Sequence, residues 1–294
     1  MMLREFLRGL SLKGPCCGIK NVKQPIKNQS RMSSWGYYDS CFGPDDWNKE
    51  YPIAKHGKRQ SPIDIKISQL KHREYPKLEI CYDCRDITTV KNTGTTAKFI
   101  SAAKNSYIKG GPLEGTYNLV QFHFHWGAVD CRGSEHTING RPYSAEAHLV
   151  HQNTKYASAS EALQHPDGMA VLGAFVEITD TKNEAFDAIV ENLQNIQDGH
   201  TEAEVMGDIH PELLLPNEIG SYACYGGSLT TPPLSECVQW INFHEPITMS
   251  EHQINQFRSL HSTKEGSEPH RPLVDNYRPV QPINGRAVFC RICC

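Results

Sequence analysis

The chain has 294 residues, of which 38% are hydrophobic and 9% aromatic, and its formal net charge is −3. This length and composition allow a substantial buried core, in one large domain or two small ones. The small net charge does not indicate nucleic acid or an acidic membrane as a partner, and no apolar run approaches the roughly 20 residues that span a bilayer.

The first 33 residues differ from the rest, because basic side chains dominate them. Seven Lys or Arg residues precede Trp35, whereas Glu5 is the single acid there. Apolar residues at positions 3, 6, 7 and 10 share one helical face, which is typical of a mitochondrial leader. A disordered basic tail is an alternative, and so is translation from Met32. We therefore predict an intracellular protein, cytoplasmic or, alternatively, located in the mitochondrial matrix.

From Trp35 onward, short runs rich in β-branched and aromatic residues recur between Gly, Pro and Asn clusters, as in strands. The strongest runs are Leu78–Tyr82, Ala97–Ser101, Tyr117–Trp126, Ala145–Asn153, Met169–Ile178, Val238–Phe243 and Ala287–Ile292. Helical spacing predicts helices over Lys182–Gln197 and Ser250–Leu260, the second opening with Ser250 and Gln253 as a capping box. We therefore predict one mainly β (α+β) domain over residues 34–290, with peripheral helices.

The 11 cysteines are an odd number, so at least one is free or pairs between chains. Two Cys-x-x-Cys pairs, Cys81/Cys84 and Cys290/Cys293, could together hold a structural zinc ion. Cys81 lies in a strand-like run, however, whereas such pairs usually lie in tight turns, so free thiols in a reducing compartment are the preferred interpretation. For the tail over residues 291–294, which ends in Cys294, oxidative dimerisation, lipid attachment and no role all stay open.

Two of the predicted strands contain histidines at alternate positions. Alternate residues of a strand share a face, so His123 and His125 point to one side of the strand over 117–126 and its aromatic residues to the other. His148 lies on the strand over 145–153. If these strands are neighbours, three imidazoles converge. Three protein ligands with an open fourth position are the arrangement of catalytic zinc.

A polar residue precedes two of these histidines on the same face. Gln121 lies two residues before His123, and Glu146 two residues before His148. Such acceptors fix the tautomer of a ligand imidazole and raise its basicity. One His-x-His strand alone would favour a half-buried, hydrogen-bonded histidine pair, whereas two histidine strands with their own acceptors favour a metal site.

Seven separated motifs resemble the alpha carbonic anhydrases, in order, over about residues 34–290. They are Trp35–Tyr37, Arg59–Ile65, Phe122–Gly127, Gly133–Thr137, Ala145–His151, Gly227–Pro233 and Val274–Pro279. The resemblance implies a large twisted, mostly antiparallel sheet with Zn²⁺ at the foot of a conical cleft. It also implies reversible hydration of carbon dioxide to bicarbonate and a proton by a zinc-bound hydroxide, with a secondary esterase activity.

The same resemblance implies roles for individual residues. It makes the three histidines zinc ligands and gives the backbone carbonyl of Asn276 as the acceptor that orients His125. It makes Thr230 the residue that holds the hydroxide, Glu135 the carboxylate that receives the Thr230 proton, and Thr231 part of the same wall. The apolar wall where carbon dioxide would wait matches Val150, Val171, Leu229, Val238 and Trp240.

The sequence departs from the family pattern at two places. Fast members carry a proton-shuttle histidine where this chain has Thr95, and threonine does not titrate near neutral pH as imidazole does. We therefore expect slow proton release and a strong dependence on buffer; Lys98, near the same rim, would disfavour a cationic buffer. Secreted members share a disulfide at positions that are Ala54 and Leu234 here, which supports an intracellular location.

The expected partners are small molecules: carbon dioxide or bicarbonate as substrate and sulfonamides as inhibitors of a monomeric enzyme. Two other classes of function stay open. A binding protein that keeps the fold without the chemistry typically lacks one or more metal histidines, whereas this chain retains all three. A zinc hydrolase of another kind is the second alternative, although the sequence lacks the His-Glu-x-x-His motif of the commonest metallopeptidases.

Overall fold

The strands of residues 35–38 and 42–291, which the computed structural model describes, pair into one 13-stranded sheet and a separate two-stranded one. The predicted leader over 1–33, Met32, Cys293 and Cys294 lie outside these described residues. The large sheet contains β2 (Lys71–His72), β3 (Glu79–Cys81), β4 (Ile87–Asn92), β5 (Ala97–Ser101), β6 (Tyr107–Lys109), β7 (Thr116–Trp126), β9 (Ala145–Asn153), β10 (Met169–Thr179), β11 (Thr201–Glu204), β12 (Tyr222–Gly227), β13 (Val238–Phe243), β14 (Ile247–Ser250) and β15 (Phe289–Cys290). The small sheet pairs β1 (Asp64–Ile65) with β8 (Thr137–Ile138).

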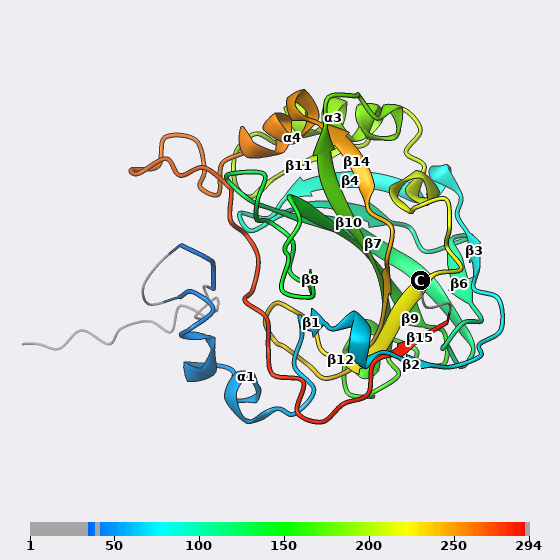
Figure 1. Ribbon diagram of the computed structural model, residues 1–294. Helices are drawn as coiled ribbons and strands as arrows, with labels where there is room; N and C mark the ends of the chain where they lie inside the picture. Colours follow the sequence, from blue (N-terminus) through cyan, green and yellow to red (C-terminus); the bar gives the residue numbers. More distant parts are fainter. Residues whose placement is uncertain (1–34, 39–41, 292–294) are drawn as a thin grey trace, which may run out of the picture. The chain divides into compact units, whose positions relative to one another are not determined.

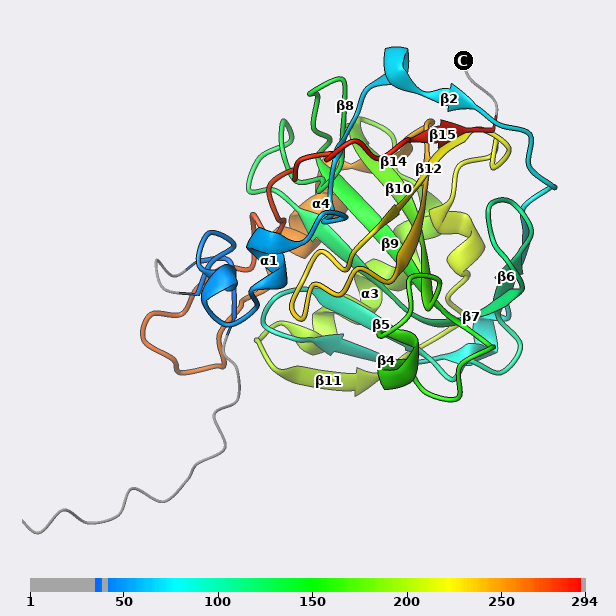
Figure 2. The same ribbon diagram turned by 90° about the horizontal axis from the view of Figure 1, so that it is seen from below.

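The large sheet is mostly antiparallel, as predicted. Its strands follow the order β11-β4-β5-β7-β9-β10-β13-β12-β15-β2, with β14 beside β10 and with β6 joining β3 to β7. The exceptions are the parallel pairs β10 with β13, β10 with β14, and β15 with β2. Figure 2 shows β4, β5, β7, β9 and β10 side by side at the middle of this sheet.

The helices are few and short, which confirms the predicted mainly β class. They are α1 (Ile53–His56), α2 (Ala159–Ala162), α3 (Asp187–Leu193) and α4 (Glu251–Arg258), with 3₁₀ turns η1 (Trp47–Lys49), η2 (Ile67–Gln69), η3 (Cys84–Asp86), η4 (Glu184–Phe186), η5 (Gln194–Ile196) and η6 (Pro211–Leu214). Figure 1 shows α3 and α4 packed together at the top of the view. Within the described part of the chain, none of the helices has the length and apolar character needed to cross a membrane.

The single helix predicted over Lys182–Gln197 is wrong, because the segment divides into η4, α3 and η5. The Asn183 side chain accepts the Ala185 N–H and begins a 3₁₀ turn instead of a longer helix. The second predicted helix is confirmed as α4, whose capping box joins Ser250 and Gln253 in both directions.

The strand predictions hold best for the central strands. Ala97–Ser101, Ala145–Asn153 and Val238–Phe243 have the predicted bounds, and β7 and β10 are each one residue longer than predicted. Within the described part of the run over 287–292, the strand is Phe289–Cys290, which pairs with the two residues of β2 and with two residues of β12. The run over 78–82 likewise narrows to β3, which pairs with the three residues of β6.

Alternate residues of the central strands pack into two hydrophobic clusters, one on each face of the sheet. On β10, Ala170 and Leu172 belong to the larger cluster, whereas Met169 and Val171 belong to the smaller one. The aromatic residues of β7 enter the larger cluster, and Phe122 is fully buried. The histidines of β7 therefore project from the opposite face, beside the smaller cluster.

The prediction of free thiols is confirmed for only part of the described cysteines. Free thiols are found at Cys81, Cys84, Cys131, Cys224 and Cys237. The expectation is wrong for Cys290, which is disulfide-bonded. Because Cys290 carries no thiolate in this state, it cannot join Cys81 and Cys84 in a four-thiolate zinc site.

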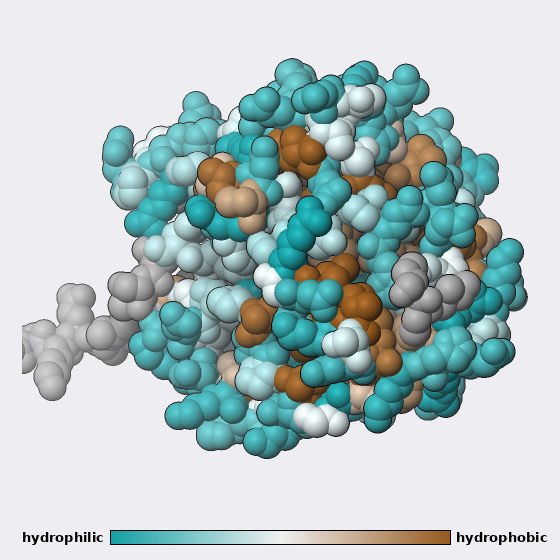
Figure 3. All heavy atoms as spheres, in the orientation of Figure 1, coloured by the Kyte–Doolittle hydropathy of each residue, from teal (hydrophilic) through white to brown (hydrophobic). Residues whose placement is uncertain are grey.

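Figure 3 shows one face of the protein, where hydrophilic residues predominate and hydrophobic residues gather in smaller patches. The large hydrophobic side chains exposed on the described residues are spread along the chain: Tyr38, Phe42, Val129, Met206, Leu213, Val280 and Ile283. Isolated apolar residues of this kind are normal on a folded protein and do not by themselves mark an interface.

Candidate metal centre

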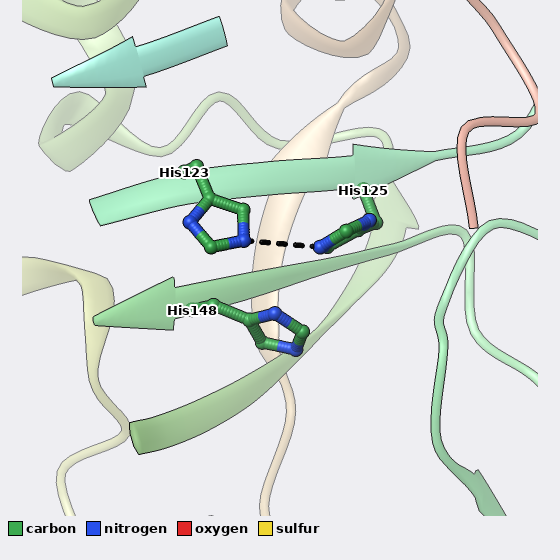
Figure 4. Close-up of side chains that lie close together, drawn as sticks. All are labelled: His123, His125 and His148. Atoms are coloured by element: carbon green, nitrogen blue, oxygen red, sulfur yellow. Dashed lines mark hydrogen bonds between the residues drawn. The ribbon is translucent and has the colours of Figure 1, made fainter. Parts of the chain in front are cut away.

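Three histidine rings converge on the face of β7 and β9 that lies opposite the larger hydrophobic cluster. β7 contributes His123 and His125, and β9 contributes His148, which lies directly opposite His123 in the antiparallel register. Figure 4 shows the three rings turned toward one common space. One nitrogen of each ring lies within 4.8 Å of the other two, so the predicted convergence is present.

The two histidines of β7 use their outer ring nitrogens to bind acceptors. His123 Nδ1 lies 2.9 Å from Gln121 Oε1, and His125 Nδ1 lies 2.7 Å from the Asn276 carbonyl oxygen. Because these partners are acceptors, each Nδ1 carries the proton and donates. Each Nε2 is therefore left with a lone pair.

The dashed contact in Figure 4 joins these two lone pairs, His123 Nε2 and His125 Nε2, at 3.1 Å. With both protons on the outer nitrogens, the contact has no hydrogen to share. Two facing lone pairs at this distance repel each other unless a cation lies between them. The geometry is therefore that of two ligands of one metal ion.

The third ring is oriented by a buried carboxylate. His148 Nε2 donates to Glu146 Oε1 at 2.7 Å, which leaves the His148 Nδ1 lone pair toward the other rings. His136 Nδ1 donates to the same oxygen at 2.7 Å, and the backbone N–H groups of Glu135 and His136 donate to Oε2. Burial alone would raise the pKa of Glu146, but His136 and His148 lower it well below its usual range. Glu146 thus stays ionised.

A second buried carboxylate faces the rings directly. Glu135 Oε2 lies 3.3 Å from His125 Nε2 and 3.8 Å from His148 Nδ1. It has no hydrogen-bond partner among the described residues, whereas Oε1 accepts the Arg278 N–H at 2.8 Å. Acceptor atoms thus surround the space between the rings, so a bound cation would satisfy them.

The two ligand histidines of β7 are held in the form that binds metal. Burial lowers the pKa of His123 well below its usual range, and the neighbouring ligand rings and Lys98 act in the same direction. Burial also lowers the pKa of His125, although the charge of Glu135 opposes this shift. Neutral imidazoles are the form that coordinates transition metals, so the residues present fit Zn²⁺.

The predicted threonines lie on the turn that follows β12. Thr230 is buried, and the Thr231 carbonyl accepts the Leu234 N–H at 3.0 Å. The predicted hydrogen bond from Thr230 to Glu135 is not among those formed between the described residues, in which Glu135 Oε2 has no partner. The roles of both residues stay predictions.

The five residues of the predicted apolar wall lie together beside the rings. Four belong to the smaller hydrophobic cluster and the fifth packs against it; they are Val150, Val171, Val238, Trp240 and Leu229. The Trp240 ring lies 4.8 Å from the His148 ring, centroid to centroid. Trp240 therefore places this wall against one of the ligand rings, and the role of the wall in binding carbon dioxide stays a prediction.

Thr95 is linked to the metal centre through one residue. Its carbonyl accepts the Asn276 side-chain N–H at 2.9 Å, and the Asn276 backbone carbonyl binds His125. Lys98 lies on β5 opposite His123. Burial lowers the pKa of Lys98, and the nearby Lys91 lowers it further.

Sequence analysis missed a chain of polar groups behind Glu146. His136 Nε2 lies 2.7 Å from the Tyr225 hydroxyl, which donates to Ser61 Oγ at 2.8 Å. Arg278 binds the Ser61 carbonyl with its guanidinium and Glu135 with its backbone. The one available signal was the position of His136 and Arg278 inside the quoted motifs.

Comparisons with known proteins agree with this geometry. A sequence model of the eukaryotic-type carbonic anhydrases matches residues 42–292. Carbonic anhydrase 3 from Sus scrofa is 45% identical over 259 residues, which cover 86% of this chain and 96% of the relative. Carbonic anhydrase 3 from Mus musculus and from Bos taurus are 44% and 43% identical over the same shares.

Proposed function

Because the chain belongs to the eukaryotic-type carbonic anhydrase family, it is a carbonate dehydratase, and we propose that it hydrates carbon dioxide reversibly with Zn²⁺ held by His123, His125 and His148. The observation that supports this proposal most is the convergence of three ring lone pairs whose outer nitrogens are all bound to acceptors. When bound, Zn²⁺ supplies a Lewis acid that makes hydroxide available near neutral pH, an established property of this family.

The acceptors bound to the outer ring nitrogens fix the orientation of the three ligand imidazoles. Gln121, the Asn276 carbonyl and Glu146 hold each ring in one tautomer and one rotation. Glu146 in addition accepts two backbone N–H groups, so its carboxylate cannot turn without breaking several bonds. This preorganisation keeps the metal position fixed through a reaction cycle.

Thr230 and Glu135 are proposed to orient the attacking oxygen. A threonine hydroxyl that donates to a carboxylate must accept from the nucleophile, and it thereby turns a nucleophile lone pair toward carbon. The unpartnered Glu135 Oε2 is an acceptor available for that hydroxyl. Thr231 is proposed to line the same wall.

The apolar wall is proposed to hold the other reactant. Carbon dioxide is linear and carries no net dipole, so contact with Val150, Val171 and Trp240 suits it better than hydrogen-bonding groups would. Leu229 and Val238 complete this wall. The reaction also releases a proton, and Thr95 cannot accept it near neutral pH; buffer must take over part of that role.

The alternatives are less well supported. A related protein without the chemistry would not need three oriented imidazole lone pairs, and this chain has them. Esterase activity toward activated esters and inhibition by sulfonamides are proposed as well, because the same centre would attack other carbonyl groups and bind an anionic nitrogen. The monomeric state and the intracellular location stay predictions.

The metal content of the full chain tests the proposed ligand set. Purified protein dialysed against metal-free buffer should retain one tightly bound zinc per chain, and His148→Ala should lose it because only two ligands remain. Glu146→Gln should weaken zinc binding by about 10–100-fold, the usual cost of losing a ligand's outer partner. His165→Ala is the matched control, because His165 stacks on Tyr156 away from the centre. Full zinc retention by His148→Ala would contradict the proposal.

A further inference from the structure

A second group of metal-binding side chains lies outside the centre described above, where the segment after α4 runs beside the start of β11. Figure 1 shows this segment in orange. The His261 N–H donates to the Gln197 carbonyl at 2.8 Å, and the Gly199 N–H donates to the Thr263 carbonyl at 2.9 Å. Asp198 therefore lies between two backbone positions that are tied to the segment after α4.

The same segment folds back on itself and brings a second histidine to Asp198. The Ser262 N–H donates to the Arg271 carbonyl at 2.8 Å, and His261 forms a β-bridge with Pro272. These bonds hold His270 beside His261. Three separate parts of the chain are thus joined by backbone hydrogen bonds around one group of side chains.

The side chains of Asp198, His261 and His270 offer ligand atoms that all lie within 4.8 Å of one another. His270 Nε2 lies 2.8 Å from Asp198 Oδ1, and His261 Nδ1 lies 4.0 Å from the same oxygen. The two rings stack with their centroids 3.7 Å apart and their planes 12° from parallel.

One atom of this group is unsatisfied. His261 Nδ1 is buried and has no hydrogen-bond partner among the described residues, although the His261 ring as a whole is 33% exposed. The atom is too far from Asp198 Oδ1 for a hydrogen bond. A ligand atom that faces a carboxylate across 4.0 Å is what a metal ion between them would satisfy, since each ligand bond would span about 2.0–2.2 Å.

We propose that Asp198, His261 and His270 form a second binding site for a divalent transition-metal ion, separate from the three-histidine centre. Two imidazoles and one carboxylate suit Zn²⁺, Ni²⁺ or Cu²⁺ rather than Mg²⁺ or Ca²⁺, which prefer oxygen ligands. Stacked rings cannot both aim a lone pair at one ion, so one ring must turn on binding. Exposures of 33% for His261 and 37% for His270 leave room for that rotation.

A different group, Cys84, Asp208 and His210, also brings ligand atoms together. It is the weaker candidate, because His210 Nδ1 already binds Glu212 Oε1 at 3.1 Å and none of its side-chain nitrogens and oxygens is left buried without a partner. It supplies the matched control, since His210→Asn removes an imidazole from a competing group without touching the proposed site.

The proposed site is connected by hydrogen bonds to the turn that contains Thr95, so metal binding there should stabilise this turn. The Asn92 side chain donates to the His261 carbonyl at 2.9 Å, and it accepts the Gly94 N–H at 2.9 Å. An ion that anchors His261 therefore also anchors the residue that shapes the turn. Because a ligand that binds only the folded state stabilises it, the metal should raise the melting temperature.

The test titrates Ni²⁺ into the full chain whose tight zinc site is already filled, with calorimetry for stoichiometry and a thermal melt for stabilisation. The wild type should bind Ni²⁺ and melt at a higher temperature. His261→Asn and His270→Asn should each weaken this binding by about tenfold or more, since even losing a ligand's outer partner costs about 10–100-fold. His210→Asn should bind Ni²⁺ as the wild type does.

Wild-type affinity in both His261→Asn and His270→Asn would overturn the proposal, and so would a wild type that binds no Ni²⁺. Asp198→Asn provides a third variant if one histidine variant folds poorly, and retention of the tight zinc identifies correctly folded protein. The readout does not depend on carbon dioxide hydration, so the proposed function and this second site can fail separately.

Discussion

Each ligand histidine of the centre has two nitrogens with different tasks. At His125, Nδ1 donates to the Asn276 carbonyl and Nε2 is left for the metal; at His148 the two nitrogens exchange these tasks, because Glu146 binds Nε2. Residue type alone does not distinguish the two cases. The acceptor next to each ring decides which nitrogen binds the metal.

At the same scale, the Thr95 position makes a kinetic prediction. Thr95→His places a group with a pKa near 6.5 where the chain has a hydroxyl that does not titrate. Turnover of carbon dioxide should rise by up to about 100-fold at low buffer concentration, the lower end of what a positioned acid–base group contributes. Added imidazole should raise wild-type turnover and affect the variant less.

Thr88→His is the matched control for this experiment, because Thr88 is exposed on β4 and the variant adds the same imidazole away from the turn. Stopped-flow hydration at several buffer concentrations gives the comparison. If the Thr95→His variant turns over at the wild-type rate, and if free imidazole does not raise the wild-type rate, proton release at this position does not limit turnover.

At the scale of elements, the pairing of β7 with β9 determines whether a metal centre exists. The register sets His123 opposite His148, with a register shift between Leu119 and Gln121 earlier in β7. A slip of one residue would turn the histidines of β7 toward the larger hydrophobic cluster. The alternation of histidine with Phe122, Phe124 and Trp126 therefore specifies the centre and the core together.

β9 also contains a buried histidine that the mechanism does not use. His151 is fully buried; its Nδ1 faces the Ala170 carbonyl at 3.3 Å, and its Nε2 lies 2.9 Å from the Tyr82 hydroxyl. Burial lowers the pKa of His151 from 6.5 to about 3, although its backbone hydrogen bonds oppose the shift. The folded protein thus holds this ring neutral.

This shift predicts how stability depends on pH. Between pH 6.5 and about 3 the unfolded chain binds a proton at His151 that the folded chain does not, so acidification favours unfolding. The free energy of unfolding should fall by up to about 1.4 kcal/mol per pH unit from this residue. Urea unfolding at pH 7, 6 and 5 should give a shallower decline for His151→Gln than for the wild type. Parallel declines would contradict this origin of acid sensitivity.

At the scale of the whole chain, sequence analysis predicted the parts that follow a strict period. The central strands and the three-histidine convergence follow from alternation along β7 and β9, and they were predicted with nearly correct bounds. The prediction of a single helix over 182–197 failed because the Asn183 side chain competes with helical hydrogen bonding at the start of this segment. The predicted strand bounds at the ends of the sheet were wrong because strand length there depends on short partner strands, such as β2 for β15, that are far away in sequence.

The polar network behind the centre could not be predicted from spacing. His136 lies at least 75 residues along the chain from both Ser61 and Tyr225. Only the folded sheet brings these side chains into contact. The disulfide at Cys290 was also missed, since the strand-like context of Cys81 favoured free thiols and carries no information about Cys290. Local patterns thus predicted the ligands, whereas the groups that support them required the three-dimensional structure.

The central claim is that the three-histidine centre hydrates carbon dioxide, and stopped-flow hydration on the zinc-loaded full chain tests it most directly. The account predicts measurable hydration that a sulfonamide abolishes, that His148→Ala loses, and that increases with buffer concentration. One zinc per chain without any hydration would contradict it, and Thr230 and Glu135 would then need a different explanation.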